Sequence, residues 1–270
     1  MANAPLMLEL NHIRKTFNKG TINEKPALLG VTLKLNPGDF CTVIGGNGAG
    51  KSPCLNAIAG VWPVDGGSII VDGENITGLP EYKRAEFLGR VFQDPMNGTA
   101  ATMQIDENLA LAARRGNRRG LGWGITKQEH EIYHEQLKTL ELGLEDRMTQ
   151  KVGLLSGGQR QALTLLMATL KKPKLLLLDE HTAALDPKTA EKVLRLTDEV
   201  VKRDSLTALM VTHNMRDAIR MGNRLIMMNE GRIVYEVSGE EKKHLQVSDL
   251  LEKFSDVSHG QFANDRMMLA

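Results

Sequence analysis

The sequence is poor in features that define whole classes of protein. It has two cysteines in 270 residues, too few for a disulfide framework or a cysteine-rich metal cluster. We therefore expect Cys41 and Cys54 to be small buried apolar residues in a reducing compartment. No uninterrupted apolar run approaches the roughly 20 residues that span a bilayer. The leucine run Leu175–Leu178 has only the length of a strand.

An excess of charge of one sign is also missing. The net charge of +1 gives no electrostatic reason to expect nucleic acid or an anionic membrane as the main partner. The strongest basic cluster, Arg114–Gly120, is expected to be a solvated loop, with contact to an acidic surface of a partner as the minor alternative. The N-terminal MANAPLMLEL lacks the basic region and apolar core of a signal peptide. These features, with 41% hydrophobic and 25% charged residues, predict a cytoplasmic globular protein.

What the chain does have is an alternation of short apolar runs and helical patterns. This alternation predicts an α/β fold with a largely parallel sheet. The pattern is purely helical between Phe92 and Lys174, which predicts an inserted helical lobe at about 94–172. We expect one domain over residues 1–240 and a C-terminal appendage over 241–270, with a helical stretch near Val247–Phe254. Strands are predicted at about Leu6–Arg14, Val31–Leu35, Asp39–Ile44, Ser68–Val71, Leu88–Phe92, Lys174–Leu178, Thr207–Val211 and Arg224–Asn229. Helices are predicted at about Gly50–Ala59, Asp106–Arg114, Lys127–Leu142, Gly157–Leu170, Pro187–Arg203 and Met215–Met221.

The segment Gly45–Ser52, GGNGAGKS, matches the phosphate-binding pattern G-x-x-x-x-G-K-[ST]. It follows the predicted strand FCTVI and precedes a predicted helix, which is the context that the pattern requires. Glycines let backbone N–H groups turn towards phosphates, and the positive end of the following helix faces them as well. We expect Lys51 to reach the β- and γ-phosphates and the Ser52 hydroxyl to bind Mg²⁺.

Two carboxylates end the buried strand of the segment KLLLLDEHTAALD, Lys174–Asp186. Asp179 is placed to hold Mg²⁺ through its water shell. Glu180 is placed to polarise the water that attacks the γ-phosphate. A carboxylate pair after a strand is weak evidence alone, and it becomes strong together with the phosphate loop.

A second anion-binding helix start is predicted at Leu155–Gln161, LSGGQRQ. Ser156, Gly157 and Gly158 open a predicted helix, where backbone N–H groups and the helix dipole attract anions. A plain N-cap explains the same residues equally well. The chain thus has two phosphate-binding helix starts but one phosphate loop. This raises a geometric question: how both helix starts could bind the same nucleotide.

Taken in order, GGNGAGKS, LSGGQ and LLLLDE resemble the nucleotide-binding subunit of an ABC transporter, over about residues 6–235. The resemblance implies a P-loop NTPase core with a mostly parallel sheet, an antiparallel β subdomain and an inserted α-helical lobe. It also implies a head-to-tail homodimer, or a heterodimer with a similar chain. Each ATP then lies between the phosphate loop of one chain and the signature motif LSGGQ of the other, which answers the geometric question.

The resemblance assigns further roles residue by residue. Phe17, in RKTFNKG, matches the aromatic that stacks on adenine, with a core aromatic as the alternative. Gln93, in VFQDP, matches the glutamine that contacts Mg²⁺ and senses the transmembrane partner, with a surface glutamine as the alternative. His213, in LMVTHN, matches the histidine that hydrogen-bonds the γ-phosphate, against a satisfied core histidine. The other six histidines are expected at the surface.

The complete set of expected site residues follows from these motifs. The segment Ala183–Asp186 matches a loop that crosses the dimer interface. The ATP-binding residues are Phe17, Gly45, Gly46, Asn47, Gly48, Ala49, Gly50, Lys51, Ser52, Pro53, Ser156, Gly157, Gly158 and Gln159. The Mg²⁺ residues are Ser52, Gln93 and Asp179, and the catalytic residues are Lys51, Gln93, Glu180 and His213.

One departure from the family pattern affects the site. Pro53 stands where the family has Thr or Ser, whose backbone N–H and hydroxyl contact the α-phosphate; proline has neither group. A hydrogen bond to a charged group contributes roughly 1.5–3 kcal/mol, so ATP affinity is expected to fall about 10- to 100-fold. The φ of proline suits the first turn of a helix, so the fold is expected to hold. His181, where the family usually has Pro, and Cys54, where Leu is common, are expected to matter little.

The resemblance implies an ATPase subunit that energises a transporter from the inner face of the cell membrane. The permease must be a separate polypeptide, contacted by the helical lobe and the region of Gln93. Residues Gln93–Leu121 and Leu155–Leu170 resemble the ATPase of a bacterial uptake system of the tryptophan- or tyrosine-type group. An importer that works with a substrate-binding protein is therefore favoured. Two alternatives stay open: a soluble, assembly-type ABC ATPase, and a subunit that binds ATP weakly because of Pro53.

Overall fold

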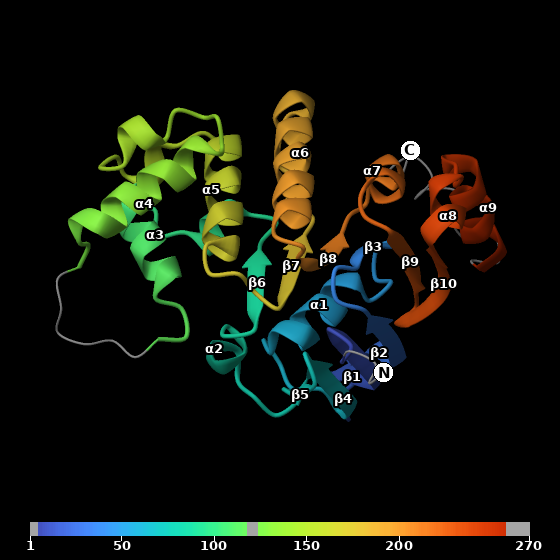
Figure 1. The fold of residues 1–270 in the computed structure, drawn as a ribbon. Coiled ribbons are helices and arrows are strands. Elements are labelled where there is room, and N and C mark those ends of the chain that lie inside the picture. Colours follow the sequence, from blue (N-terminus) through green and yellow to red (C-terminus); the bar gives the residue numbers. More distant parts are fainter. Residues whose placement is uncertain (1–4, 118–123, 258–270) are drawn as a thin grey trace.

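The computed structural model describes residues 5–117 and 124–257, and two sheets organise them (Figure 1). A four-stranded antiparallel sheet has the order β2-β1-β4-β5, and a six-stranded sheet has the order β10-β9-β3-β8-β7-β6. In the six-stranded sheet all strands are parallel except β10 at one edge. The strands are β1 (Leu8–Phe17), β2 (Lys25–Leu35), β3 (Phe40–Ile44), β4 (Gly66–Val71), β5 (Glu74–Asn75), β6 (Leu88–Val91), β7 (Leu175–Asp179), β8 (Thr207–Val211), β9 (Arg224–Asn229) and β10 (Arg232–Ser238).

Between β6 and β7 the described residues form helices and no strand, so the helical lobe of the predicted fold is present. The expected fold class, a mostly parallel P-loop core with an antiparallel β sheet and an inserted helical lobe, is confirmed. The helices are α1 (Lys51–Ala59), α2 (Glu81–Arg84), α3 (Ile105–Ala113), α4 (Lys127–Lys138), α5 (Gly157–Thr169), α6 (Pro187–Arg203), α7 (Met215–Arg220), α8 (Gly239–Lys243) and α9 (Val247–Val257), with short 3₁₀ helices at Pro95–Gly98, Glu145–Arg147 and Val152–Leu154.

Both faces of the six-stranded sheet are covered, and β7 shows how. Leu176 and Leu178 belong to the core cluster that contains the buried residues of α3, α4, α5 and α6. Leu175 and Leu177 belong to the cluster formed with α1 and the antiparallel sheet. A strand buried on both faces needs an unbroken apolar run, which is why β7 reads as consecutive leucines. Helices α1 and α5 therefore pack on opposite faces of the sheet.

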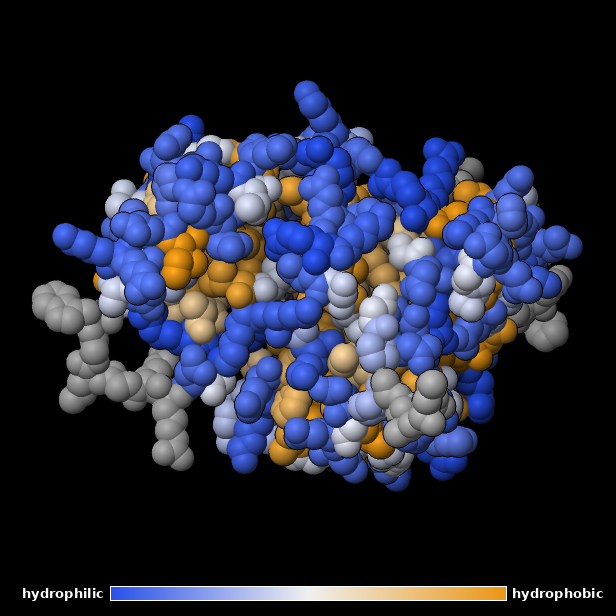
Figure 2. Space-filling view, in the orientation of Figure 1, coloured by the Kyte–Doolittle hydropathy of each residue, from blue (hydrophilic) through white to orange (hydrophobic). Residues whose placement is uncertain are grey.

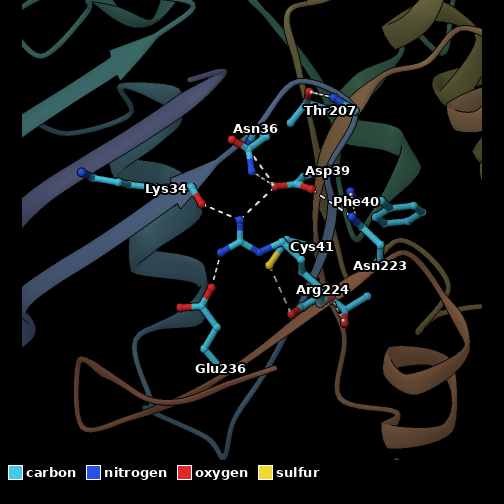
Figure 3. A network of polar contacts seen from close by, with 11 residues as sticks. Lys34, Asn36, Asp39, Phe40, Cys41, Thr207, Asn223, Arg224 and Glu236 are labelled. Carbon is cyan, nitrogen blue, oxygen red and sulfur yellow. Dashed lines mark hydrogen bonds and ion pairs between the residues drawn. The ribbon is translucent and has the colours of Figure 1, made fainter. Parts of the chain in front are cut away.

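A network of polar contacts joins the two sheets at the edge where the parallel strands begin (Figure 3). Arg224, the first residue of β9, donates from Nη1 to the carboxylate of Asp39 at 2.9 Å and to the carbonyl oxygen of Lys34 at 2.6 Å. Its Nη2 pairs with Glu236 of β10. Asp39 also accepts from the side chain of Asn223 at 2.9 Å. This network lies where the parallel strands begin, at the end of the sheet opposite the loops that carry the sequence motifs.

Several predictions about individual residues can be compared with the structure. Cys41 and Cys54 are both buried, as expected. The expectation that the basic cluster is a solvated loop is wrong for its first two residues. Arg114 pairs with Glu129 at 2.9 Å, and Arg115 donates to backbone carbonyls at the end of α5 and beyond. The residues 118–120 of that cluster, and 258–270 of the expected appendage, lie outside the described residues. Within residues 5–117 and 124–257, every helix is too short or too polar to span a bilayer.

Candidate functional site

The phosphate-loop motif connects the end of β3 to the start of α1, as its pattern requires. Gly50 is the N-cap of α1 in the left-handed region, with φ 101°. A Cβ on Gly50 would lie 2.8 Å from the carbonyl oxygen of Ala27, and one on Gly45 would lie 2.4 Å from that of Met228. The backbone therefore passes too close to its neighbours for any side chain at these two positions. Asn47 and Gly48, at the tip of the loop, are exposed.

The side chain of Lys51 lies inside this loop. Its Nζ donates to the carbonyl oxygens of Gly45, at 2.6 Å, and Gly46, at 3.1 Å, and the residue is buried. Ser52, the next residue, is exposed at the start of α1. The ammonium group, the helix start and the loop N–H groups together make this corner electropositive.

Pro53 is the third residue of α1 and does not interrupt it. The first backbone hydrogen bond after the cap runs from Cys54 N to Gly50 O, at 2.9 Å. The amide hydrogen that proline lacks is one of the first few that have no partner within a helix. The expectation that the helix tolerates Pro53 is confirmed.

Asp179 is the last residue of β7 and Glu180 follows it. They lie at the same end of the parallel sheet as the phosphate loop, which follows β3. Asp179 is paired with Arg90 of β6, with Nη2 and Oδ2 3.5 Å apart. Burial raises the pKa of Asp179, while Arg90 acts against this rise. Glu180 adopts a left-handed backbone with φ 42°, and its N–H donates to the carbonyl oxygen of Val211. A residue held in this strained region is a common feature of functional sites.

His213 follows β8 and faces Glu180, with Nδ1 and Oε2 3.5 Å apart. Their hydrogen bond lowers the pKa of Glu180 and raises the pKa of His213. The positive charge of Lys51 also lowers the pKa of Glu180, and it acts against the rise in the pKa of His213. The three side chains therefore lie within one electrostatic environment. The structure thus brings together Lys51, Asp179, Glu180 and His213 from three separate segments of the sequence.

Gln93 and Phe17 lie at the ends of two other strands. Gln93 is exposed, two residues beyond β6, and the Phe92 carbonyl before it accepts from the side chain of Gln161 at 3.1 Å. Phe17 ends β1 and is half-buried. Its ring meets the ring of Trp62 edge to face, with centroids 5.0 Å apart. Lys15 Nζ also lies over the Phe17 ring, 5.7 Å from its centroid. The core-aromatic alternative for Phe17 therefore has partners in the structure, and stacking on adenine stays a prediction.

The signature residues open α5 in the helical lobe. Ser156 is the N-cap: its Oγ accepts from Gln159 N at 3.3 Å, and the Gln159 side chain accepts from Ser156 N at 3.1 Å. This reciprocal pair is a capping box. Ser156 and Gly157 are exposed, while Gly158 is buried; a Cβ there would lie 2.0 Å from the Thr189 methyl group on α6. Because α5 and α1 pack on opposite faces of the sheet, the two helix starts do not form one site within the chain.

Sequence reasoning missed Arg90 and misplaced His181. Arg90 is a charged residue inside β6, an edge strand of the six-stranded sheet, directly before VFQ, and that signal was available. His181 was expected at the surface, but it is 2% exposed and its Nε2 lies 3.0 Å from Thr197 Oγ1. Burial lowers its pKa to about 4, so it is a neutral core residue that packs against α6.

Comparison with known proteins agrees with this geometry. A family model described as ABC transporter matches residues 28–183. The Tyrosine transport ATP-binding protein of Clostridioides difficile (strain R20291) is 42% identical over 248 residues, which are 92% of this chain and 98% of that protein. The Spermidine/putrescine import ATP-binding protein PotA of Haemophilus influenzae (strain ATCC 51907 / DSM 11121 / KW20 / Rd) is 33% identical over 242 residues, 89% of this chain and 60% of that protein. A solved dimeric ATP-binding cassette, in a post-hydrolysis state bound to ADP and Pi, superimposes with a TM-score of 0.74 at 29% identity, and covers 86% of this chain and 98% of that one.

Proposed function

The chain belongs to the ABC transporter family, and from this premise we propose that it hydrolyses MgATP at the Lys51–Glu180–His213 site to drive uptake of a small solute. It is an ABC ATPase subunit, and the resemblance to ATPases of tyrosine-type uptake systems is confirmed by the relative that is 42% identical. The relatives named above do not favour the soluble, non-transport alternative. The observation that carries the proposed chemistry is the 3.5 Å contact between Glu180 and His213 beside Lys51.

The roles we propose for the site residues follow from charge and position. Loop N–H groups, Lys51 and the start of α1 hold the phosphates, and Phe17 stacks on adenine. Ser52, Gln93 and Asp179 supply hydroxyl, amide and carboxylate oxygens, the donors that suit Mg²⁺. The metal, when bound, neutralises charge on the β- and γ-phosphates.

The proton in this scheme is handled by the pair at the strand ends. Glu180 has a lowered pKa and is ionised at neutral pH, so it can accept a hydrogen bond from the attacking water. His213, released from Glu180 by the nucleotide, is placed to donate a hydrogen bond to the γ-phosphate.

We propose that two copies of the chain enclose each ATP. Ser156 and Gly157 are exposed at the start of α5, which covers the opposite face of the sheet from α1, so this helix start is accessible to the phosphates of a second chain. The dimeric cassette bound to ADP and Pi supports this arrangement.

The helical lobe offers a surface for the permease at the inner face of the membrane. Figure 2 shows apolar side chains gathered among charged ones over this lobe. A groove of about 430 Å³ runs along α3, with Met103, Leu111 and Ile125 as apolar walls and Glu107 and Arg114 as charged ones. We propose that a short cytoplasmic segment of the permease docks there, and that a separate binding protein delivers the solute. Tyrosine is the first solute to test, because it is the substrate named for the relative of nearly full-length similarity.

Replacement of Glu180 by Gln tests the proposed chemistry. The amide keeps the shape of the side chain but cannot accept a proton from water, so hydrolysis should fall roughly 10²–10⁴-fold. ATP binding should persist, and an ATP-bound dimer should accumulate on size-exclusion chromatography. Glu199→Gln, on the exposed face of α6, is the matched control and should behave as wild type. Full hydrolysis by Glu180→Gln, or recovery of the chain from cells only in soluble complexes, would contradict the proposal.

A further inference from the structure

The chain beyond β10 folds back onto α7. Figure 1 shows α8 and α9 beside α7, at the edge of the six-stranded sheet formed by β9 and β10. Met215 and Ala218 of α7 share a buried cluster with Leu250 and Phe254 of α9. This cluster covers one side of α7 with apolar contacts. The segment therefore packs against the six-stranded sheet and α7.

Lys242 of α8 makes the polar half of this contact. It is 2% exposed, and its Nζ donates to the carbonyl oxygens of Ile219 at 2.9 Å, Met221 at 2.5 Å and Gly222 at 3.1 Å. Burial lowers the pKa of Lys242 to about 8, so the ammonium stays mostly protonated at pH 7 and has three N–H groups for three carbonyls. These carbonyls lie at the C-terminal end of α7, where helix carbonyls lack partners and carry partial negative charge.

The other end of α7 is tied to the site. His213 is followed by Asn214, the N-cap of α7, whose side chain accepts from the N–H groups of Arg216 at 2.9 Å and Asp217 at 3.1 Å. Any shift of α7 along its axis is therefore passed to His213 through one residue. A helix as short as Met215–Arg220 has no stability of its own, so its position is set by the groups that pack against it.

We propose that Lys242 is a positioning residue for hydrolysis: the α8–α9 segment clamps α7 and thereby holds His213 in register with Glu180. The clamp acts through two contacts of different kind, the three carbonyls on Lys242 and the apolar packing of Leu250 and Phe254. This inference rests on the proposed role of His213 in hydrolysis. It gives a function to the segment that follows the sheet.

The test compares Lys242→Met with Lys243→Met. Lys243 is the next residue, exposed and paired with Glu240, so the control removes the same charge one position away. Lys242→Met keeps the length of the side chain and removes its three N–H groups. We expect kcat for ATP to fall about 10- to 100-fold with the Kd for ATP within twofold of wild type, because a displaced catalytic group costs rate more than binding. Lys243→Met should match wild type.

Two further measurements separate positioning from general damage. In the nucleotide-free protein, the imidazole NMR resonances of His213 should move in Lys242→Met and not in Lys243→Met. In a His213→Ala background, Lys242→Met should cause little further loss of kcat, because both changes act through one group. If Lys242→Met does not fold, Leu250→Ala, which weakens the apolar contact instead, takes its place in all three measurements.

The results have distinct meanings. Unmoved His213 resonances with an unchanged kcat, or full additivity of Lys242→Met with His213→Ala, would overturn the clamp and leave Lys242 as a structural residue. Failure of Glu180→Gln to reduce hydrolysis would overturn the proposed chemistry instead. The His213 resonances would still report on the clamp in that case, because they are read without nucleotide.

Discussion

Arg90 holds the carboxylate of Asp179 from the neighbouring strand, with Nη2 and Oδ2 3.5 Å apart. The same Nη2 donates to Asn56 Oδ1 of α1 at 2.6 Å, and the guanidinium carbon lies 4.5 Å from the centroid of the Phe92 ring. Both charged side chains are largely buried, at 14% and 15% exposed. Arg90 thus links the start of the Gln93 loop, α1 and the carboxylate that we expect to hold Mg²⁺.

Replacement of Arg90 by Met should weaken the response of the site to Mg²⁺. Without the guanidinium, Asp179 loses a fixed partner, and its pKa, already raised by burial, should rise further. Residues that orient a metal ligand contribute about 10- to 100-fold to metal affinity. The Mg²⁺ concentration that half-saturates binding of a fluorescent ATP analogue should rise by that factor.

The control for Arg90→Met is Arg195→Met on the exposed face of α6, which removes an arginine that pairs with Glu141 and Glu199 and not with Asp179. It should leave the Mg²⁺ titration unchanged. If Arg90→Met also leaves it unchanged while the protein stays folded, Arg90 contributes to packing alone.

Pro53→Thr should tighten ATP binding, because it restores an N–H and a hydroxyl at the start of α1. The helix itself has nothing to gain, since its first backbone bond is made by Cys54 and not by residue 53. The expected change is about 10- to 100-fold in the Kd for ATP, measured by calorimetry.

Pro53→Ala separates the two restored groups, because it returns the N–H without the hydroxyl. It should bind ATP with an affinity between those of wild type and Pro53→Thr. An unchanged Kd in Pro53→Thr would mean that Pro53 costs no phosphate contact.

Much of this architecture could be predicted because it depends on residues that are neighbours in the sequence. The phosphate loop needs a strand before it and a helix after it, and both FCTVI and the α1 pattern are contiguous with Gly45–Ser52. The run Leu175–Leu178 marks a strand buried on both faces. Parallel strands end at one edge, so Asp179, Glu180 and His213 could be expected to meet there.

What escaped prediction depends on partners distant in sequence. Arg90 and Asp179 are brought together only by the pairing of β6 with β7. Lys242 looks like its exposed neighbour Lys243 until the end of α7 is placed against it. The strand β10 was missed because it is a half-exposed edge strand, although Glu230–Gly231, both with positive φ, form the tight turn of a hairpin. The domain boundaries and the site roles remain predictions.

Asp39→Asn should destabilise the fold without affecting the nucleotide site. Asp39 and Arg224 are 10% and 15% exposed, and Asp39→Asn removes one carboxylate from the buried Arg224 while Glu236 stays paired with it. Loss of one hydrogen-bonded charge contact costs about 2 kcal/mol of unfolding free energy, which urea denaturation would measure. The Kd for ATP should be unchanged, since the pair lies at the opposite edge of the sheet.

Asp198→Asn is the matched control for Asp39→Asn, since Asp198 forms an exposed pair with Lys202 on α6. A surface pair of this kind is worth at most about 1 kcal/mol. Equal losses in the two variants would contradict a structural role for the Asp39–Arg224 pair.

His181 should make the protein less stable in mild acid. The Thr197 hydroxyl donates to the carbonyl oxygen of Val193 at 2.9 Å, so it accepts from His181 and keeps the ring in its neutral Nε2–H form. Burial lowers the pKa of His181 to about 4 in the folded protein, whereas the unfolded chain has the ordinary value near 6.5. Below pH 6.5 His181 becomes protonated in the unfolded state, whereas it stays neutral in the folded state until the pH approaches 4. The stability contributed by the neutral ring is therefore complete above pH 6.5 and is lost as the pH falls towards 4.

The measurement for His181 is the difference between wild type and His181→Gln, followed by urea denaturation at pH 7, 5.5 and 4.5. From the two pKa values, wild type should lose about 2–3 kcal/mol more than the variant between pH 7 and 4.5. Glutamine can donate to Thr197 but does not titrate, so the variant removes the charge change and keeps the hydrogen bond. If the free energy of unfolding changed with pH equally in the two proteins, protonation of His181 would cost the folded state no stability. The buried, neutral histidine inferred from the structure would then be wrong.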